Sequence, residues 1–327
     1  FGVNDWAGIV ERLGAKYRNE NETQRELSTP SHYAYLKISE GCNWMCGYCA
    51  IPLIRGRHKS VPMEALIAEA EALVAKGVRE IMVIAQDTTY YGVDIYGERK
   101  LGELLERLCA IEKLEWIRLH YAYPTDFPDE VIEVMARQKK ICRYLDIPFQ
   151  HISDNQLTLM KRRHTKAEAL ALIEKLRRAI PDIALRTTLL VGYPGETEED
   201  FNELMQFVRD MRFERMGAFA YSDEEGTYSN LNYTDDVPSE VKQERVDRLM
   251  ELQAQISEEI NAKKVGQTFK VIIDREEEDF YVGRTEYDSP DVDGEVLIAK
   301  NKQLTIGDFY QVKITESDMY DLYGEVL

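Results

Sequence analysis

Between residues 34 and 237 the chain alternates short apolar, β-rich runs with segments of helical periodicity, and this alternation restricts the fold more than any other feature. Because each helix carries the chain back across one face of the sheet, the strands of such a sequence run parallel. The runs that we predict to be strands are 34–39, 80–85, 116–122, 144–149, 184–191 and 216–221. Six βα units are fewer than the eight of a complete TIM barrel, so we expect a sheet that is open or only partly closed.

Helical periodicity fills the intervals between these strands, and a different pattern follows. The expected helices are 62–76, 101–110, 129–137, 166–179, 198–211 and a long one at 239–264. After Gly266 the apolar residues alternate with period two, which is typical of strands. Short strands at 269–273, 280–284, 295–299, 309–314 and 320–327 predict a small β-barrel.

This pattern divides the chain into four parts. We expect a linker from a missing N-terminal domain (1–33), with a short helix around Trp6, and then an α/β domain (34–237). A connecting helix (238–264) and the β-barrel (265–327) complete the chain.

The composition is that of a globular protein with a strong negative charge. Hydrophobic residues make up 44% of the 327 residues, and no apolar stretch reaches the roughly 18 residues of a membrane helix, so we expect no membrane span. The net charge of −18 would repel a polyanion such as RNA unless a local basic patch compensates. Residues 265–327 alone carry 15 acidic and 6 basic side chains, a net charge of −9.

Three of the five cysteines, Cys42, Cys46 and Cys49, lie in one eight-residue stretch directly after the first predicted strand. This arrangement is unsuited to disulfides, so we expect a reducing, cytoplasmic location. Thiolates are the usual ligands of iron–sulfur clusters, and three of them leave one iron of a cubane open to a substrate or cofactor. The alternative is a zinc site with His58 as the fourth ligand.

The C-x3-C-x2-C loop after the first strand resembles that of the radical S-adenosylmethionine (SAM) superfamily. Further stretches resemble the methylthiotransferase family within it, and the C-terminal barrel resembles a TRAM domain. The stretches that carry this resemblance are 35–42, 51–52, 55–56, 86–89, 150–154, 160–162 and 191–197. The implied fold is an open (βα)6 partial TIM barrel followed by a small OB-like TRAM barrel.

The resemblance also implies cofactors and a reaction. Cys42, Cys46 and Cys49 would hold a [4Fe–4S] cluster whose open iron binds SAM, and one electron would cleave SAM to a 5′-deoxyadenosyl radical. A second [4Fe–4S] cluster is expected in the N-terminal domain, and Cys109 and Cys142 are too isolated to replace its ligands. We therefore expect the chain as given to bind the SAM cluster but not to complete methylthiolation. An electron donor such as flavodoxin or ferredoxin is implied as a partner.

Seven further residues are candidates for contacts to SAM, by resemblance or by position after a strand. The alternative for each is a structural role, such as a strand-end turn, a core aromatic or an internal hydrogen-bond network. The candidates are Tyr48, Gln86, Asp87, Gln150, Ser153, Arg186 and Gly192. Two basic clusters, 55–59 and 161–164, face either the substrate or the solvent.

Two branches of the methylthiotransferase family differ in substrate. One modifies an adenosine of tRNA, and the other modifies the β-carbon of an aspartate in small-subunit ribosomal protein twelve. A TRAM barrel that binds RNA should be basic, whereas an acidic barrel attracts a basic ribosomal protein. The stretches 85–89, 221–227, 283–285 and 290–294 also resemble the ribosomal-protein branch, which we predict. The alternatives are the tRNA enzyme and a zinc-binding adaptor for basic partners.

Overall fold

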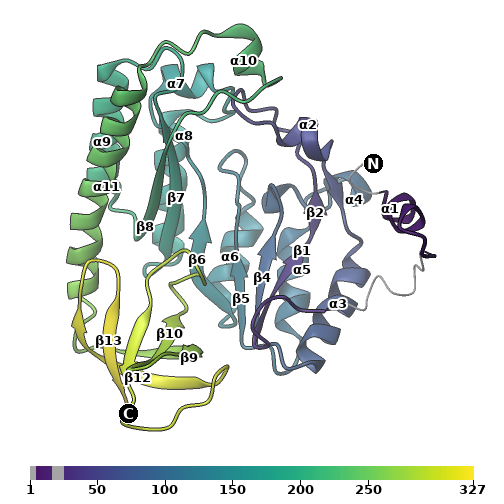
Figure 1. Ribbon diagram of the computed structural model, residues 1–327, viewed down its shortest axis with the longest axis vertical. Coiled ribbons are helices and arrows are strands. Elements are labelled where there is room, and N and C mark those ends of the chain that lie inside the picture. Colours follow the sequence, from purple (N-terminus) through teal and green to yellow (C-terminus); the bar gives the residue numbers. More distant parts are fainter. Residues whose placement is uncertain (1–4, 17–25) are drawn as a thin grey trace.

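The computed structural model describes residues 5–16 and 26–327 and consists of an α/β domain and a small β-barrel (Figure 1). The α/β domain contains a six-stranded sheet in the order β1-β4-β5-β6-β7-β8, and every neighbouring pair is parallel. The strands are β1 (Tyr33–Lys37), β4 (Glu80–Ile84), β5 (Trp116–Leu119), β6 (Ile141–Asp146), β7 (Ala184–Val191) and β8 (Arg215–Ala220). The sheet is open, so the predicted partial barrel is confirmed.

Helices between the strands cover one face of this sheet and enclose the main hydrophobic core (Figure 1). They are α3 (Met63–Ala75), α5 (Leu101–Cys109), α6 (Asp129–Arg137), α8 (Lys166–Ala179) and α9 (Glu198–Met211), as the periodicity predicted. Thr165 and Thr197 each begin a helix with a capping box, in which the threonine and an acidic residue three positions later satisfy each other's backbone N–H groups.

The predicted strand at 144–149 is displaced by three residues, because β6 begins at Ile141 and ends at Asp146. Pro148 has no N–H to donate to a neighbouring strand, so the ladder ends before it. Short elements without a full period escaped prediction: β2 (Ser39–Glu40), α2 (Ile51–Arg55), β3 (Lys59–Ser60), a 3-10 turn η2 (Thr88–Tyr90), α4 (Val93–Tyr96), α7 (Asp154–Leu159) and α10 (Tyr228–Asn232). The helix expected around Trp6 is α1 (Trp6–Arg12), while other parts of the predicted linker, 1–4 and 17–25, lie outside the described residues.

The C-terminal strands close into a barrel in the order β10-β11-β13-β12-β9. They are β9 (Thr268–Glu276), β10 (Phe280–Thr285), β11 (Val296–Ala299), β12 (Phe309–Ser317) and β13 (Leu322–Val326). The long helix α11 (Ser239–Ala262) packs along the edge strand β8 and leads into this barrel. None of the helices in residues 5–16 and 26–327 has the length and apolarity that a bilayer-spanning segment requires.

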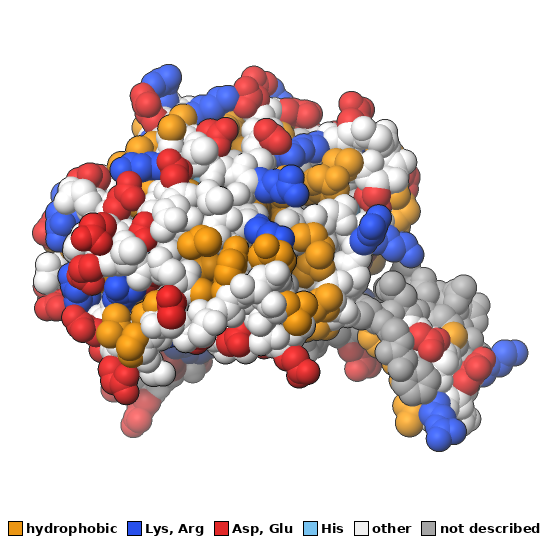
Figure 2. Space-filling model, turned by 90° about the horizontal axis from the view of Figure 1, so that it is seen from above, with side chains coloured by type: hydrophobic (Ala, Val, Ile, Leu, Met, Phe, Trp, Pro, Cys, Tyr) orange, Lys and Arg blue, Asp and Glu red, His pale blue; other side chains and the backbone are white. Residues whose placement is uncertain are grey.

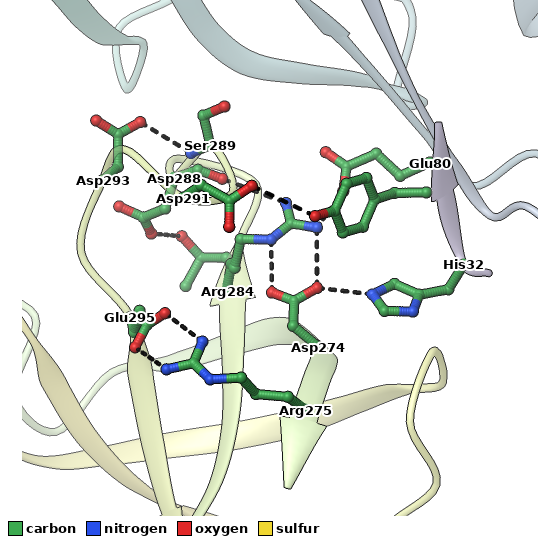
Figure 3. A network of polar contacts seen from close by, with 12 residues as sticks. His32, Glu80, Asp274, Arg275, Arg284, Asp288, Ser289, Asp291, Asp293 and Glu295 are labelled. Carbon is green, nitrogen blue, oxygen red and sulfur yellow. Dashed lines mark hydrogen bonds and ion pairs between the residues drawn. The ribbon is translucent and has the colours of Figure 1, made fainter. Parts of the chain in front are cut away.

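A buried ion network joins the barrel to the amino ends of the sheet strands (Figure 3). Glu80, the first residue of β4, accepts hydrogen bonds from Arg118 of β5 (2.8 Å) and from Arg284 of β10 (2.5 Å). Arg284 also donates two hydrogen bonds to Asp274, which contacts His32 at 2.8 Å. Burial alone would raise the pKa of Glu80, but the two guanidinium groups lower it to about 2. The carboxylate therefore stays ionised in the interior.

Other acidic side chains of the barrel also pair with residues of the sheet. This corrects the expectation that the whole net charge of −9 is available to attract a basic partner. Asp288 pairs with Arg215 of β8, and Asp293 lies 3.4 Å from Arg186 of β7. Both carboxylates are buried. Their charge is compensated within the protein, so only the exposed part of the −9 remains to attract a basic partner. The exposed acidic side chains include those of the β9–β10 turn, 276–279.

Replacing Glu80 with Gln removes the negative charge from between two buried guanidinium groups. We expect the free energy of unfolding to fall by about 3–5 kcal/mol, as is typical when one partner of a buried ion pair is lost. Arg275→Gln is the control, because its pair with Glu295 is largely exposed and such pairs contribute about 0–1 kcal/mol. Urea denaturation measures both. Equal losses in the two variants would contradict the expectation that the buried network contributes more to stability than an exposed ion pair.

A decrease in pH below about 6.5 should destabilise the protein through His120, which lies between the sheet and barrel residue Ser289. Burial, together with Arg118 and Arg186, lowers the pKa of His120 to about 3. Between pH 6.5 and 3 the unfolded chain binds the proton and the folded chain does not, so stability is complete above this range and declines within it. The slope reaches at most about 1.4 kcal/mol per pH unit for this group. Urea denaturation at pH 7 and pH 5 should show a smaller decline in His120→Asn, and identical declines would contradict this.

Candidate functional site

The three clustered cysteines line one cavity at the carboxyl ends of the strands, the end opposite the barrel. Its volume is about 470 Å³. Its walls come from the loops after β1, β4, β5 and β6, together with Arg162 after α7; the lining residues are Lys37, Cys42, Trp44, Cys46, Tyr48, Cys49, Ile51, Ile84, Ala85, Gln86, Tyr121, Tyr123, Pro148, Gln150 and Arg162. Figure 2 looks onto this end of the molecule, where hydrophobic side chains gather beside several Lys and Arg residues.

Backbone contacts that need glycine hold the cysteine loop in place. Gly41 has a φ of +74°, and a Cβ there would lie 2.3 Å from the carbonyl oxygen of Arg57. Gly47 donates to the carbonyl oxygen of Met160 and accepts from the N–H of Ser229 in α10. The loop after the first strand of the sheet is thereby tied to the segment after the last one.

Cys46 has the most elaborate surroundings of the three cysteines. Its sulfur lies 3.8 Å from the Tyr123 hydroxyl and 3.6 Å from Nη1 of Arg162. The indole of Trp44 stacks on the Tyr123 ring with a centroid distance of 4.1 Å, and its Nε1–H donates to Asp87. One group of aromatic and cationic side chains therefore packs around Cys46.

The thiols fit a group that brings its own positive charge. Burial raises the pKa of the Cys42 thiol to about 11 and also raises that of Cys49. A cysteine thiol must lose its proton before it can bind a metal, and the positive charge of a bound metal centre makes this loss favourable. Three such thiols on one cavity wall fit a [4Fe–4S] cluster with one open iron.

The zinc alternative lacks its fourth ligand. The Nε2 atom of His58 contacts the Ser60 hydroxyl at 3.0 Å and lies 3.8 Å from Asp94. Across residues 5–16 and 26–327, no three His, Cys, Asp or Glu side chains gather closely enough to hold a single metal ion. His58 therefore supports the antiparallel strand pair β2–β3 through Ser60 instead of joining the cysteines.

Three of the seven candidate SAM contacts line the cavity: Tyr48, Gln86 and Gln150. The Oε1 atom of Gln86 is buried without a protein partner, so it is available to a ligand. Gln150 has a φ of +70°, which is unusual for a residue with a side chain, and its backbone pairs with β7. The Tyr48 hydroxyl accepts a hydrogen bond from Arg162.

The other four candidates lie outside the cavity lining and have protein partners. Asp87 accepts from Trp44 and Thr89, and Ser153 donates to Asp200. Arg186 lies between Asp146 and barrel residue Asp293. Gly192 has a φ of +71°, and a Cβ there would meet Lys242. Contacts of these four residues to SAM remain predictions.

The two basic clusters, 55–59 and 161–164, differ in whether their arginines are exposed or lie at the cavity. Arg55 and Arg57 are exposed, whereas Arg162 is buried beside Cys46. Cys142 lies in the interface with the barrel and Cys109 in α5, both away from the cavity. Residues that sequence reasoning missed are Trp44, Tyr121 and Tyr123; only Trp44, inside the cysteine motif, offered a signal.

Comparison with known proteins agrees with this geometry. The model of the radical SAM superfamily matches residues 36–208, and the TRAM domain model matches residues 265–327. Over its whole length the chain is 56% identical to the ribosomal protein uS12 methylthiotransferase RimO of Parabacteroides distasonis, of which it covers 76%. The RimO protein of Porphyromonas gingivalis is 54% identical over the same share. The chain belongs to the RimO family within the radical SAM superfamily.

Membership in the RimO family identifies the cofactors as a [4Fe–4S] cluster and SAM. A more distant likeness concerns the fold alone. Coproporphyrinogen III oxidase (HemN) from Escherichia coli aligns with a TM-score of 0.53 and 18% identity over 72% of this chain and 56% of that one.

Substituting Gly47 with Ala should displace the cysteine loop. The new Cβ would lie 2.7 Å from the Tyr193 hydroxyl, which is itself held by Leu159 and Ser229. We expect less iron retained per chain after anaerobic reconstitution. Gly217→Ala is the control, since its Cβ would meet Phe219 at an ordinary 3.5 Å. Adding Tyr193→Phe to Gly47→Ala should restore part of the iron; full iron in Gly47→Ala alone would contradict the prediction.

Proposed function

We propose that this protein is a radical SAM methylthiotransferase that adds a methylthio group to the β-carbon of an aspartate in ribosomal protein uS12. The observation that carries the proposal is the cavity lined by three cysteines, in a chain that is 56% identical over its whole length to a protein named for this activity, of which it covers 76%. The exposed acidic residues of the barrel, 276–279 among them, support a protein substrate over an RNA substrate, because RNA binding needs positive charge.

In this proposal Cys42, Cys46 and Cys49 hold the [4Fe–4S] cluster, and Tyr48, Gln86 and Gln150 contact SAM within the same cavity. When bound, the cluster and SAM supply a one-electron cleavage of the sulfonium and removal of a hydrogen from an unactivated carbon. The protein's part is to leave one side of the cluster facing the cavity and to surround the cofactors with largely apolar walls. Such walls exclude water, which would otherwise quench reactive species.

The partners follow from this chemistry. The exposed acidic turn 276–279 attracts the basic uS12 protein at long range, on or off the ribosome, and a flavodoxin or ferredoxin supplies the electron. A substrate of this kind places the protein in the cytoplasm.

The test uses the full-length protein, including the N-terminal domain in which the second cluster is expected. It is reconstituted anaerobically with iron, sulfide and SAM and then incubated with dithionite and either uS12 or tRNA. We expect 5′-deoxyadenosine and the mass increase of one methylthio group on a uS12 aspartate. Methylthiolation of tRNA with unmodified uS12 would contradict the proposed substrate.

Ligand variants test the cysteine assignment. Cys42→Ala, Cys46→Ala and Cys49→Ala should each abolish 5′-deoxyadenosine formation, because no nearby side chain can replace a lost thiolate ligand. Cys142→Ala, away from the cavity, is the control and should retain the iron. Unchanged SAM cleavage in any of the three cavity variants would remove that cysteine from the ligand set.

A further inference from the structure

Cys46 differs from the other two cysteines in burial and in its donors. It is 8% exposed, whereas Cys42 and Cys49 are of intermediate exposure. The Tyr123 hydroxyl lies 3.8 Å from its sulfur, and Arg162 directs Nη1 toward it at 3.6 Å. Both distances are those of hydrogen bonds to sulfur, so the site supplies Cys46 with a phenol and a cation as potential donors.

A stack of three side chains keeps Arg162 in this position. The Cζ atom of Arg162 lies 4.2 Å from the centroid of the Tyr123 ring, and the Trp44 ring lies 4.1 Å from the same centroid. Since two groups this close cannot share one face, the guanidinium and the indole occupy opposite faces of Tyr123. Nη2 of Arg162 donates to the carbonyl oxygen of Pro148 at 2.6 Å, which fixes the orientation of the plane.

The charge of Arg162 has no carboxylate partner within the described part of the chain. It contacts the sulfur of Cys46, the hydroxyl of Tyr48, the carbonyl oxygen of Pro148 and the ring of Tyr123. A buried cation without a nearby anion is strongly unfavourable. A cysteine that binds a cluster does so as a thiolate, so Cys46 as a ligand would place an anion 3.6 Å from Nη1 of Arg162, where the two charges stabilise each other.

We propose that Arg162 and Tyr123 are positioning residues that hydrogen-bond the sulfur of Cys46 and thereby set the reduction potential of the bound cluster. The inference rests on the proposed function, because it takes Cys46 as a cluster ligand. Hydrogen bonds to the sulfurs and nearby positive charge stabilise the reduced, more negative cluster, which raises its potential. The cluster can then accept the electron more easily from its donor.

The test is an EPR-monitored redox titration of the reconstituted protein without SAM. Arg162→Gln should lower the midpoint potential because it removes the charge, and Tyr123→Phe should lower it less because only the hydroxyl is lost. Arg162→Lys should recover part of the shift. Arg163→Gln is the matched control: it makes the same charge change at the next residue, whose side chain is exposed, and should leave the potential unchanged.

A potential unchanged in Arg162→Gln would overturn the proposal. If Arg162→Gln does not retain the cluster, Arg162→Lys and Tyr123→Phe decide, and wild-type potentials in both would overturn it. SAM affinity is measured in parallel: weaker SAM binding with an unchanged potential would make Arg162 a cofactor ligand and also reject the inference. Failure of the wild-type protein to bind any cluster would instead reject the proposed function.

Discussion

All six strands of the sheet run in the same direction, and the site depends on this constraint. The loops that follow parallel strands meet at one edge, so the cysteine loop after β1 faces Gln86 after β4, Tyr123 after β5 and Gln150 after β6. The hydrogen bond between Gly47 and Ser229 then joins the two outer strands of the open sheet through their loops. The sheet itself stays open, but at its cysteine end the loop after its first strand is connected to the segment after its last strand.

The barrel occupies the other end of the same strands, and charge holds it there. Glu80 lies between Arg118 and Arg284 in the interior, and Asp288 and Asp293 pair with arginines of β8 and β7. A buried pair of this kind contributes less to net stability than to specificity of docking, since each charge must be compensated by its partner. Three of the fifteen acidic side chains of the barrel, Asp274, Asp288 and Asp293, are thus part of the domain interface and are not available to a partner.

The environment of the cysteines is asymmetric, and the asymmetry suits a cluster with one open side. Cys42 and Cys49 are partly exposed to the cavity, while Cys46 is buried against Arg162 and Tyr123. Arg162 and Tyr123 contact Cys46 from the protein interior, so the face of the three cysteines that points into the cavity stays open to the cofactor. The lining there is mostly apolar, and electrostatic interactions are stronger where the surrounding groups are weakly polar.

The sequence by itself determined the long helices, most strands of the sheet and barrel, and the cysteine loop, since these depend on local periodicity and on the spacing of three cysteines within eight residues. It missed the short elements, which have no full period, and placed β6 three residues too late. It also determined the two-domain plan, because the change of period at Gly266 is local. Only the tertiary structure decided that Arg162 and Tyr123, 116 and 77 positions from Cys46, lie against its sulfur, and that Arg186 joins the barrel interface. Such contacts follow from the register of distant strands and from the docking of one domain on another, and no local pattern records either.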